Sequence, residues 1–119
     1  MNIMEDTGQT AGSIDLEDPS TRRKAQLTKA LGHPVRLAIL KLLGERDTCF
    51  CGDFTEVLPL AQSTVSQHLK VLKESGLITG TNQGVRTCYC LDPNGIQELH
   101  QTLVSLIGMF DTSNLSDCC

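Results

Sequence analysis

Aromatic residues are scarce in this sequence. Phe, Tyr and Trp together account for 3% of the 119 residues, and Trp is absent. A core must therefore rest on Leu, Val and Ile, and the hydrophobic content of 39% suits a single domain of modest size. Because such a small core stabilises a monomer only weakly, the composition favours a protein that dimerises.

Long apolar runs are also missing. No segment approaches the roughly 20 apolar residues that cross a membrane. The N-terminal segment, residues 1–6, has neither the basic start nor the apolar stretch of a signal peptide. These absences predict a cytoplasmic protein that has no membrane partner.

Basic side chains are missing from residues 1–20, which carry five acidic residues and no Lys or Arg. All ten basic residues lie between Arg22 and Arg86, and only seven acidic residues occur from there up to Glu98. The formal net charge of −4 therefore conceals a positively charged body, which suits a nucleic-acid partner. Because residues 1–20 are rich in Gly, Ser and Thr and lack apolar periodicity, we expect them to form a disordered acidic arm.

The six cysteines fall into three close pairs, none with the Cys-x-x-Cys spacing of structural zinc knuckles. A reducing cytoplasm argues against a framework of disulfides, so these thiols indicate soft-metal or redox chemistry. The pairs are Cys49 with Cys51, Cys88 with Cys90, and Cys118 with Cys119.

Four helical segments precede a hairpin in the predicted order of elements. The expected helices span residues 21–31, 34–44 and 63–74, with a short one around 52–58. Pro34 suits the first turn of the second helix, after which apolar residues recur with a helical period. We expect Gln62 or Ser63 to cap the helix at 63–74.

The helix at 63–74 has two opposite faces. At about 100° per residue, Val65, Leu69 and Leu72 lie together, and the opposite face is polar and free of acid. Its hydroxyl, amide and cationic groups are those that contact phosphates and base edges in the major groove, although an ordinary solvated helix also shows this pattern. The polar residues are Ser63, Ser66, Gln67 and Lys70, flanked by Thr64 and His68.

A hairpin follows this helix. A strand opens at Ile78, residues 81–84 form a turn, and residues 85–91 return with alternating character. Short helices followed by a hairpin predict a winged helix-turn-helix, which is a mainly α fold with a small β-hairpin. Arg86 lies just past the predicted tip, where it would reach a phosphate or the minor groove.

A last helix, expected around residues 94–110, carries an apolar stripe with a spacing of three and four residues. The stripe is too apolar for one exposed helix. We therefore expect it to pair with the first helix or with a twin, giving a homodimer through the terminal helices. The folded domain is predicted to span residues 21–110, followed by a flexible tail at 111–119 that ends in Cys118 and Cys119.

Three segments carry a resemblance to a known family: ALGHPVRLAI at 30–39, TCFCGDF at 48–54 and STVSQHLKVL at 63–72. Together they resemble the ArsR/SmtB family of bacterial repressors, and the similarity covers about residues 21–107. The resemblance implies a homodimeric winged helix that binds a palindromic, double-stranded operator and releases it when an inducer binds. It also implies that Cys49 and Cys51 bind the inducer, as in the arsenic- and cadmium-responsive members. The residues that it implies as DNA contacts are Ser63, Thr64, Ser66, Gln67 and His68.

The chain departs from the family pattern at the inducer site. The best-known arsenic sensors have a third cysteine one turn into the third helix, where Phe54 and Thr55 stand here. The N-terminal arm, which supplies extra thiols in cadmium sensors, contains no cysteine. Because His100 is the only histidine in the last helix, the zinc site of other members is not expected.

Arsenite and antimonite favour three thiolates, so a third sulfur is needed. Cys49 and Cys51 supply two if their segment is extended, because alternate residues then point the same way. The third thiolate can come from the two cysteines of the tail. It can also come from the second strand of the hairpin, if that strand pairs with the segment of Cys49 and Cys51 and brings one of them near Cys90. We favour the tail, because a vicinal dithiol has little structural purpose there, whereas Cys88 and Cys90 are also explained as packing residues.

The sequence therefore predicts a transcriptional repressor that requires no cofactor and releases its operator when As(III) or Sb(III) binds. Alternatives within the same fold are a thiol redox or sulfide switch, with Cys51 and Cys90 as a candidate pair, and a cadmium- or lead-type sensor. An enzyme such as a thiol-dependent arsenate reductase is not expected. The sequence has no Cys-rich anion-binding loop with Arg, and Asp47 and Asp53 flank the thiols.

Overall fold

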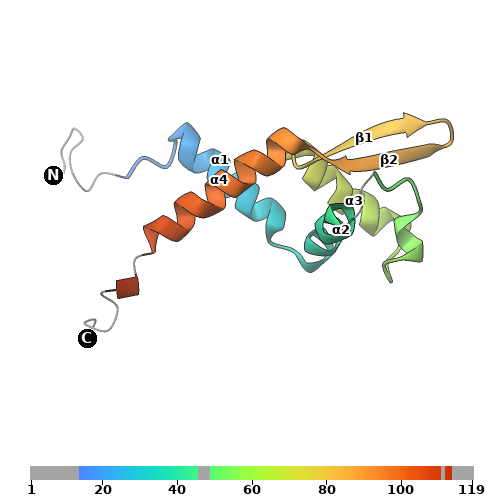
Figure 1. Cartoon of the computed structure of the whole chain (residues 1–119), viewed down its shortest axis with the longest axis horizontal. Helices are drawn as coiled ribbons and strands as arrows, with labels where there is room; N and C mark the ends of the chain where they lie inside the picture. The colour runs from blue at the N-terminus through green and yellow to red at the C-terminus, as the bar shows by residue number, and fades with distance from the viewer. Residues whose placement is uncertain (1–13, 46–48, 111, 114–119) are drawn as a thin grey trace.

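The structure is a computed structural model that describes residues 14–45, 49–110 and 112–113. It has the predicted winged helix-turn-helix fold, with α1 beside α4 at one end and α2, α3 and a two-stranded hairpin at the other (Figure 1). The elements are α1 (Pro19–Leu31), α2 (Pro34–Gly44), the 3-10 turn η1 (Phe54–Glu56), α3 (Gln62–Glu74), β1 (Ile78–Gln83), β2 (Arg86–Leu91) and α4 (Pro93–Met109).

Helix α1 begins at Pro19, two residues before its predicted start. The Asp18 carboxylate accepts hydrogen bonds from the Thr21 backbone N–H (2.9 Å) and hydroxyl (3.0 Å), and the backbone bond lowers the pKa of Asp18. Pro19 adds a preset φ at the first position. Residues 19 and 20 therefore belong to the helix and not to a disordered arm, while residues 1–13 of the predicted arm lie outside the described residues.

The helix expected around residues 52–58 is a single 3-10 turn, Phe54–Glu56. Asp53 starts this turn, because its Oδ1 accepts hydrogen bonds from the Thr55 backbone N–H (2.8 Å) and hydroxyl (2.7 Å). The Thr55 hydroxyl, with its backbone N–H, also lowers the pKa of Asp53. The residues ahead of Asp53 are therefore free to take an extended form.

Helix α3 begins at Gln62, and its N-cap is Ala61, which makes no side-chain capping bond. The prediction that Gln62 or Ser63 caps the helix is therefore wrong. The prediction of its apolar face is confirmed, because all three of its residues are buried: Val65, Leu69 and Leu72.

The wing is an antiparallel hairpin in which Gln83 lies opposite Arg86. Strand β1 runs on to Gln83, so the tip lies at Gly84 and Val85 and not at the predicted turn, residues 81–84. Gly84 has a φ of +70°, which glycine adopts without steric strain.

The core lies between α1, α2, α3, the wing and the first half of α4, and it is built mainly from Leu, Ile and Val. Two of the few aromatics join it, since Phe50 and Phe54 are buried with ring centroids 4.6 Å apart. None of the helices in the described ranges is long and apolar enough to cross a membrane. The most deeply buried side chains are Leu27, Ile39, Val65, Leu72, Leu77 and Ile78.

Arg23 of α1 ties the terminal helices to the rest of the fold. Its Nε donates to Glu98 Oε2 (2.7 Å), and its Nη2 donates to Glu98 Oε1 (2.8 Å) and to the Ser75 carbonyl oxygen (2.9 Å). The hydrogen bond from Arg23 lowers the pKa of Glu98. One guanidinium therefore joins α1, α4 and the end of α3.

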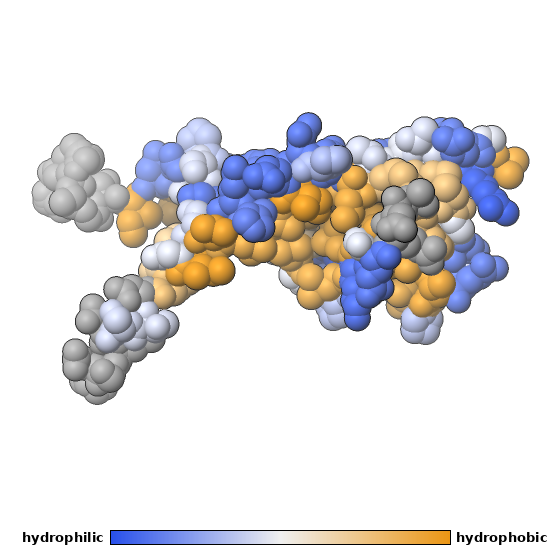
Figure 2. All heavy atoms as spheres, viewed as in Figure 1, coloured by the Kyte–Doolittle hydropathy of each residue, from blue (hydrophilic) through white to orange (hydrophobic). Residues whose placement is uncertain are grey.

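The outer half of α4 is apolar and exposed, and Figure 2 shows hydrophobic surface there. Leu99, near the start of the predicted stripe, is buried in the core. Further along, Val104 is 57% exposed and Ile107 is 72% exposed. The fold of one protomer thus covers only part of the stripe.

Candidate nucleic-acid interface and thiol cluster

The polar face predicted for α3 is exposed. Because Ala61 provides no side-chain cap, the backbone amides of the first turn can donate to an external acceptor such as a phosphate. We call this surface the reading face. It consists of Ser63, Ser66, Gln67 and Lys70, which are exposed, and Thr64, which is half-buried.

His68 differs from the other predicted DNA contacts because neighbouring elements hold its ring. Its Nδ1 lies 3.1 Å from Arg36 Nη1, and its ring centroid is 4.1 Å from that of His33. Since an arginine only donates, Nδ1 accepts and we assign the ring proton to Nε2. Burial lowers the pKa of His68, as do His33 and Arg36, so the ring is neutral at pH 7.

Arg36 is a structural residue whose role sequence reasoning missed. From α2 its guanidinium donates to the carbonyl oxygens of Ala30 (2.7 Å) and Lys29 (2.9 Å), which lie in the last turn of α1. It also reaches α3 through His68. Arg36 therefore sets the position of α3 against α1. The signal for this role in the sequence was the position of Arg36 in the first turn of α2, two residues after Pro34.

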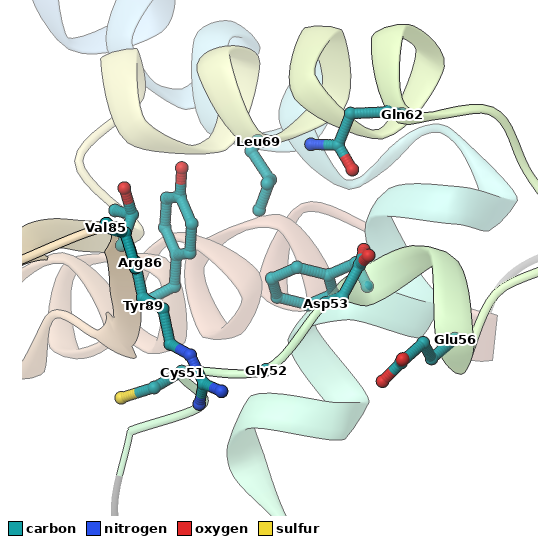
Figure 3. Close-up of a pocket in the computed structure, with 11 residues that line it drawn as sticks. Cys51, Gly52, Asp53, Glu56, Gln62, Leu69, Val85, Arg86 and Tyr89 are labelled. Atoms are coloured by element: carbon teal, nitrogen blue, oxygen red, sulfur yellow. The ribbon is translucent and has the colours of Figure 1, made fainter.

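The wing places Arg86 beside a groove between the hairpin and η1. The groove has a volume of about 440 Å³, and Cys51, Asp53 and Glu56 also line it (Figure 3). Arg86 is exposed, as expected for a residue that meets DNA, and Val85 at the tip is fully exposed.

A short antiparallel ladder joins residues 49–51 to β2. The Phe50 N–H donates to the Tyr89 carbonyl and the Tyr89 N–H donates to the Phe50 carbonyl, both at 2.9 Å. Residues that flank such a hydrogen-bonded pair face each other with Cα atoms about 4.5 Å apart. The flanking pairs here are Cys49 with Cys90 and Cys51 with Cys88, whose Cα atoms are 4.5 and 4.0 Å apart.

Both flanking pairs are disulfide-bonded, so the expectation that disulfides are absent is wrong for these four cysteines. Because alternate residues of an extended chain share a side, the four sulfurs lie on one face of the ladder. We call them the thiol cluster. Cys49 is exposed, whereas Cys88 is only 8% exposed.

The register of the ladder corrects one pairing predicted from sequence. Cys51 and Cys90 lie diagonally and each has another partner, so the candidate redox pair is wrong. The idea that the segment ahead of the third helix pairs with the wing strand is confirmed. The favoured tail thiols, Cys118 and Cys119, lie outside the described residues. While the sulfurs are bonded in pairs, the described residues contain no group of three or more His, Cys, Asp or Glu that could hold a metal ion.

Comparisons with known proteins agree with this geometry. A family model described as a helix-turn-helix domain matches residues 31–81. The arsenical resistance operon repressor of Bacillus subtilis (strain 168) is 35% identical over 99 residues, which cover 82% of this chain and 91% of that protein.

Two solved structures share the fold. A possible transcriptional regulator for arsenical resistance has a TM-score of 0.64 at 29% identity, covering 79% of this chain and 96% of its own. The homodimeric winged helix-turn-helix DNA-binding domain Mb0332 of Mycobacterium bovis, a possible ArsR-family regulator, has a TM-score of 0.61 at 26% identity. That match covers 82% of this chain and 89% of the Mb0332 fragment.

The fold and its reading face define a winged helix-turn-helix transcriptional regulator. The chain belongs to the ArsR/SmtB family of transcriptional repressors. This family acts by DNA binding and not by catalysis, so the prediction that the protein is not an enzyme is confirmed.

Proposed function

We propose that this repressor holds its operator until a trivalent metalloid, arsenite or antimonite, binds thiolates of the thiol cluster. The observation that carries the proposal is the ladder that gathers four sulfurs on one face beside the wing. The identity of 35% to the arsenical resistance operon repressor of Bacillus subtilis supports the same class of inducer.

Reduction of the two disulfides makes the donors available. As(III) and Sb(III) favour three soft thiolate ligands. Cys49 and Cys51 are two of them, and Cys88 or Cys90, across the ladder, is a third within the same protomer. The tail thiols remain a second source. No resident cofactor is needed for this chemistry.

Packing connects the thiol cluster to α3. The Phe50 and Phe54 ring centroids are 4.6 Å apart, and Phe54 lies edge-on to Tyr89 at 5.8 Å. Phe54 shares its core with Leu69 of α3. A metalloid that draws three sulfurs together would move residues 49–51, and these contacts would shift α3. Because linkage is reciprocal, DNA must weaken metalloid binding by the same factor.

In this proposal the operator is bound by a homodimer. The exposed apolar side chains on the outer half of α4 favour burial against a second copy, and the Mb0332 domain is homodimeric. A two-fold dimer would place two reading faces about 34 Å apart, one turn of DNA. Palindromic double-stranded DNA is the matching partner.

Operator release tests the proposal. Reduced protein selects its operator from a random duplex library, and fluorescence anisotropy then follows an arsenite titration. A coupling of about 2 to 3 kcal/mol predicts that operator affinity falls roughly 30- to 150-fold. The variant Cys49→Ser/Cys51→Ser should bind the operator and stay bound; its release by arsenite would overturn the proposal.

Two matched variants identify the third thiolate. Cys88→Ser/Cys90→Ser removes the wing sulfurs, and Cys118→Ser/Cys119→Ser removes the tail sulfurs. If the wing supplies the ligand, only the first variant loses its response to arsenite. Cadmium, lead and zinc in the same titration test the alternative of a divalent-metal sensor, which would require four ligands.

A further inference from the structure

The pairing within the thiol cluster is set by the backbone ladder. Phe50 and Tyr89 exchange two backbone hydrogen bonds, so only one register is available to their neighbours. That register places each cysteine of residues 49–51 directly opposite one cysteine of β2, with Cα atoms 4.5 and 4.0 Å apart. Both separations suit a disulfide between facing residues.

We infer that the thiol cluster is also an oxidation site. A peroxide converts Cys49 with Cys90, and Cys51 with Cys88, into two separate cross-strand disulfides. Oxidation thereby removes the thiolates that a metalloid requires. The formation of these two disulfides is independent of the proposed inducer, whereas the loss of metalloid uptake rests on the proposed function.

Each disulfide forms in two balanced steps. A thiolate attacks one peroxide oxygen; the S–O bond forms, the O–O bond breaks, and hydroxide leaves to become water on protonation. The facing thiolate then attacks the sulfenic sulfur; the S–S bond forms, the S–O bond breaks, and a second water results. Two thiols are oxidised by two electrons and one peroxide molecule is reduced to two waters.

Exposure assigns the roles within the pairs. Cys49 is exposed and Cys51 is half-buried at the groove between the wing and η1, so peroxide reaches these two sulfurs first. Within each pair the wing sulfur is the less exposed one: Cys90 is half-buried opposite exposed Cys49, and Cys88 is 8% exposed opposite half-buried Cys51. The cysteines of the 49–51 segment are therefore attacked, and those of β2 resolve the sulfenic acids.

Peptide mapping of the wild-type chain tests the pairing directly. Reduced protein is freed of reductant and treated with two equivalents of hydrogen peroxide per protomer. The remaining thiols are alkylated and the chain is digested with chymotrypsin without reduction. Cleavage after Phe50 and Tyr89 separates the two cysteines of each segment. We expect linked peptides joining Cys49 to Cys90 and Cys51 to Cys88; diagonal links, or sulfinic acids in their place, would overturn the inference.

Matched double variants give a second measurement in a Cys118→Ser/Cys119→Ser background. Cys51→Ser/Cys88→Ser leaves the facing pair and should lose both remaining thiols to peroxide. Cys49→Ser/Cys88→Ser leaves Cys51 and Cys90 on a diagonal. Peroxide should still oxidise Cys51, but mass spectrometry of the unreduced monomer should show no disulfide to Cys90, whose thiol stays free. Equal disulfide formation in the two variants would show that the ladder does not select partners.

Arsenic bound per protomer, measured by elemental analysis after desalting, tests the consequence for metalloid uptake. In the Cys118→Ser/Cys119→Ser background, oxidised protein should bind no arsenite, and treatment with a phosphine reductant should restore binding. If reduced protein binds none, the proposed function fails while the disulfides stand. If oxidised protein binds as much as reduced protein, oxidation does not control uptake.

Discussion

The two ends of the molecule are stabilised in different ways. At the reading end, α2, α3 and the wing enclose buried Leu, Ile and Phe side chains, and two disulfides span sequence separations of 41 and 37 residues. At the other end, α1 and α4 add Leu27, Ala30 and Leu99 to the edge of that core, and the Arg23–Glu98 ion pair joins the two helices. The outer half of α4 leaves apolar residues exposed. The reading end is therefore complete within one protomer, whereas the terminal helices keep apolar surface available for another contact.

Reduction of the two disulfides should have the largest effect on the free energy of unfolding, and it acts only at the reading end. In the chain-entropy description, a cross-link that closes a loop of about 40 residues stabilises the fold by about 4 kcal/mol. The two loops are nested, so the second bond closes only a small ring and should add little. Denaturant unfolding of oxidised and reduced protein measures the difference.

The variant Cys51→Ser/Cys88→Ser sharpens this prediction. It retains the bond between Cys49 and Cys90, so the oxidised variant should keep most of the stabilisation of the oxidised wild type. A loss of about half would mean that the two bonds act independently.

Gly95→Ala disturbs the contact between the start of α4 and the residue that follows α3, where the two ends of the molecule meet. A Cβ at Gly95, in the first turn of α4, would overlap the carbonyl oxygen of Gly76 after α3. We expect a loss of roughly 2 to 3 kcal/mol in the free energy of unfolding, because backbone must move. Gly108→Ala is the matched control on the same helix, with no atoms near its Cβ position, and should be neutral or slightly stabilising.

Lys70→Ala and Arg86→Ala test whether the reading end carries the DNA contacts. Each should weaken operator binding about five- to tenfold and reduce the slope of log affinity against log salt by about 1.8, because the homodimer loses two phosphate contacts. Arg22→Ala removes an exposed cation from the start of α1 at the other end and should leave the slope unchanged. If all three variants had similar slopes of log affinity against log salt, the DNA contacts would not lie at the reading end.

Glu98→Gln should have the smallest effect, about 0.5 to 1 kcal/mol at pH 7, because the ion pair is partly exposed. The pKa of Glu98 is lowered in the fold from an ordinary value of 4.5, so its contribution is complete above that pH. The contribution is lost as the pH falls below 4.5 through the folded pKa. Urea unfolding of wild type and variant from pH 7 to pH 3 should therefore converge at the acid end.

Much of the fold could be predicted because its signals are local. Helical periodicity identified α2 and the buried face of α3, and the order of helices and hairpin identified the winged helix. The boundaries at α1 and η1 were misplaced, because single carboxylates at Asp18 and Asp53 decide where those elements begin. A cap is one residue in a polar stretch, and period-based reasoning does not detect it.

The sequence by itself determined the family, the winged helix-turn-helix and the reading face, since each depends on residues within one element or a few turns of it. Only the tertiary structure decided which sulfurs face each other. That choice depends on the register of residues 49–51 against β2, which the Phe50–Tyr89 backbone pair sets between distant parts of the chain. A shift of one residue would turn the side chains to the other face, and no local pattern in the sequence specifies that register.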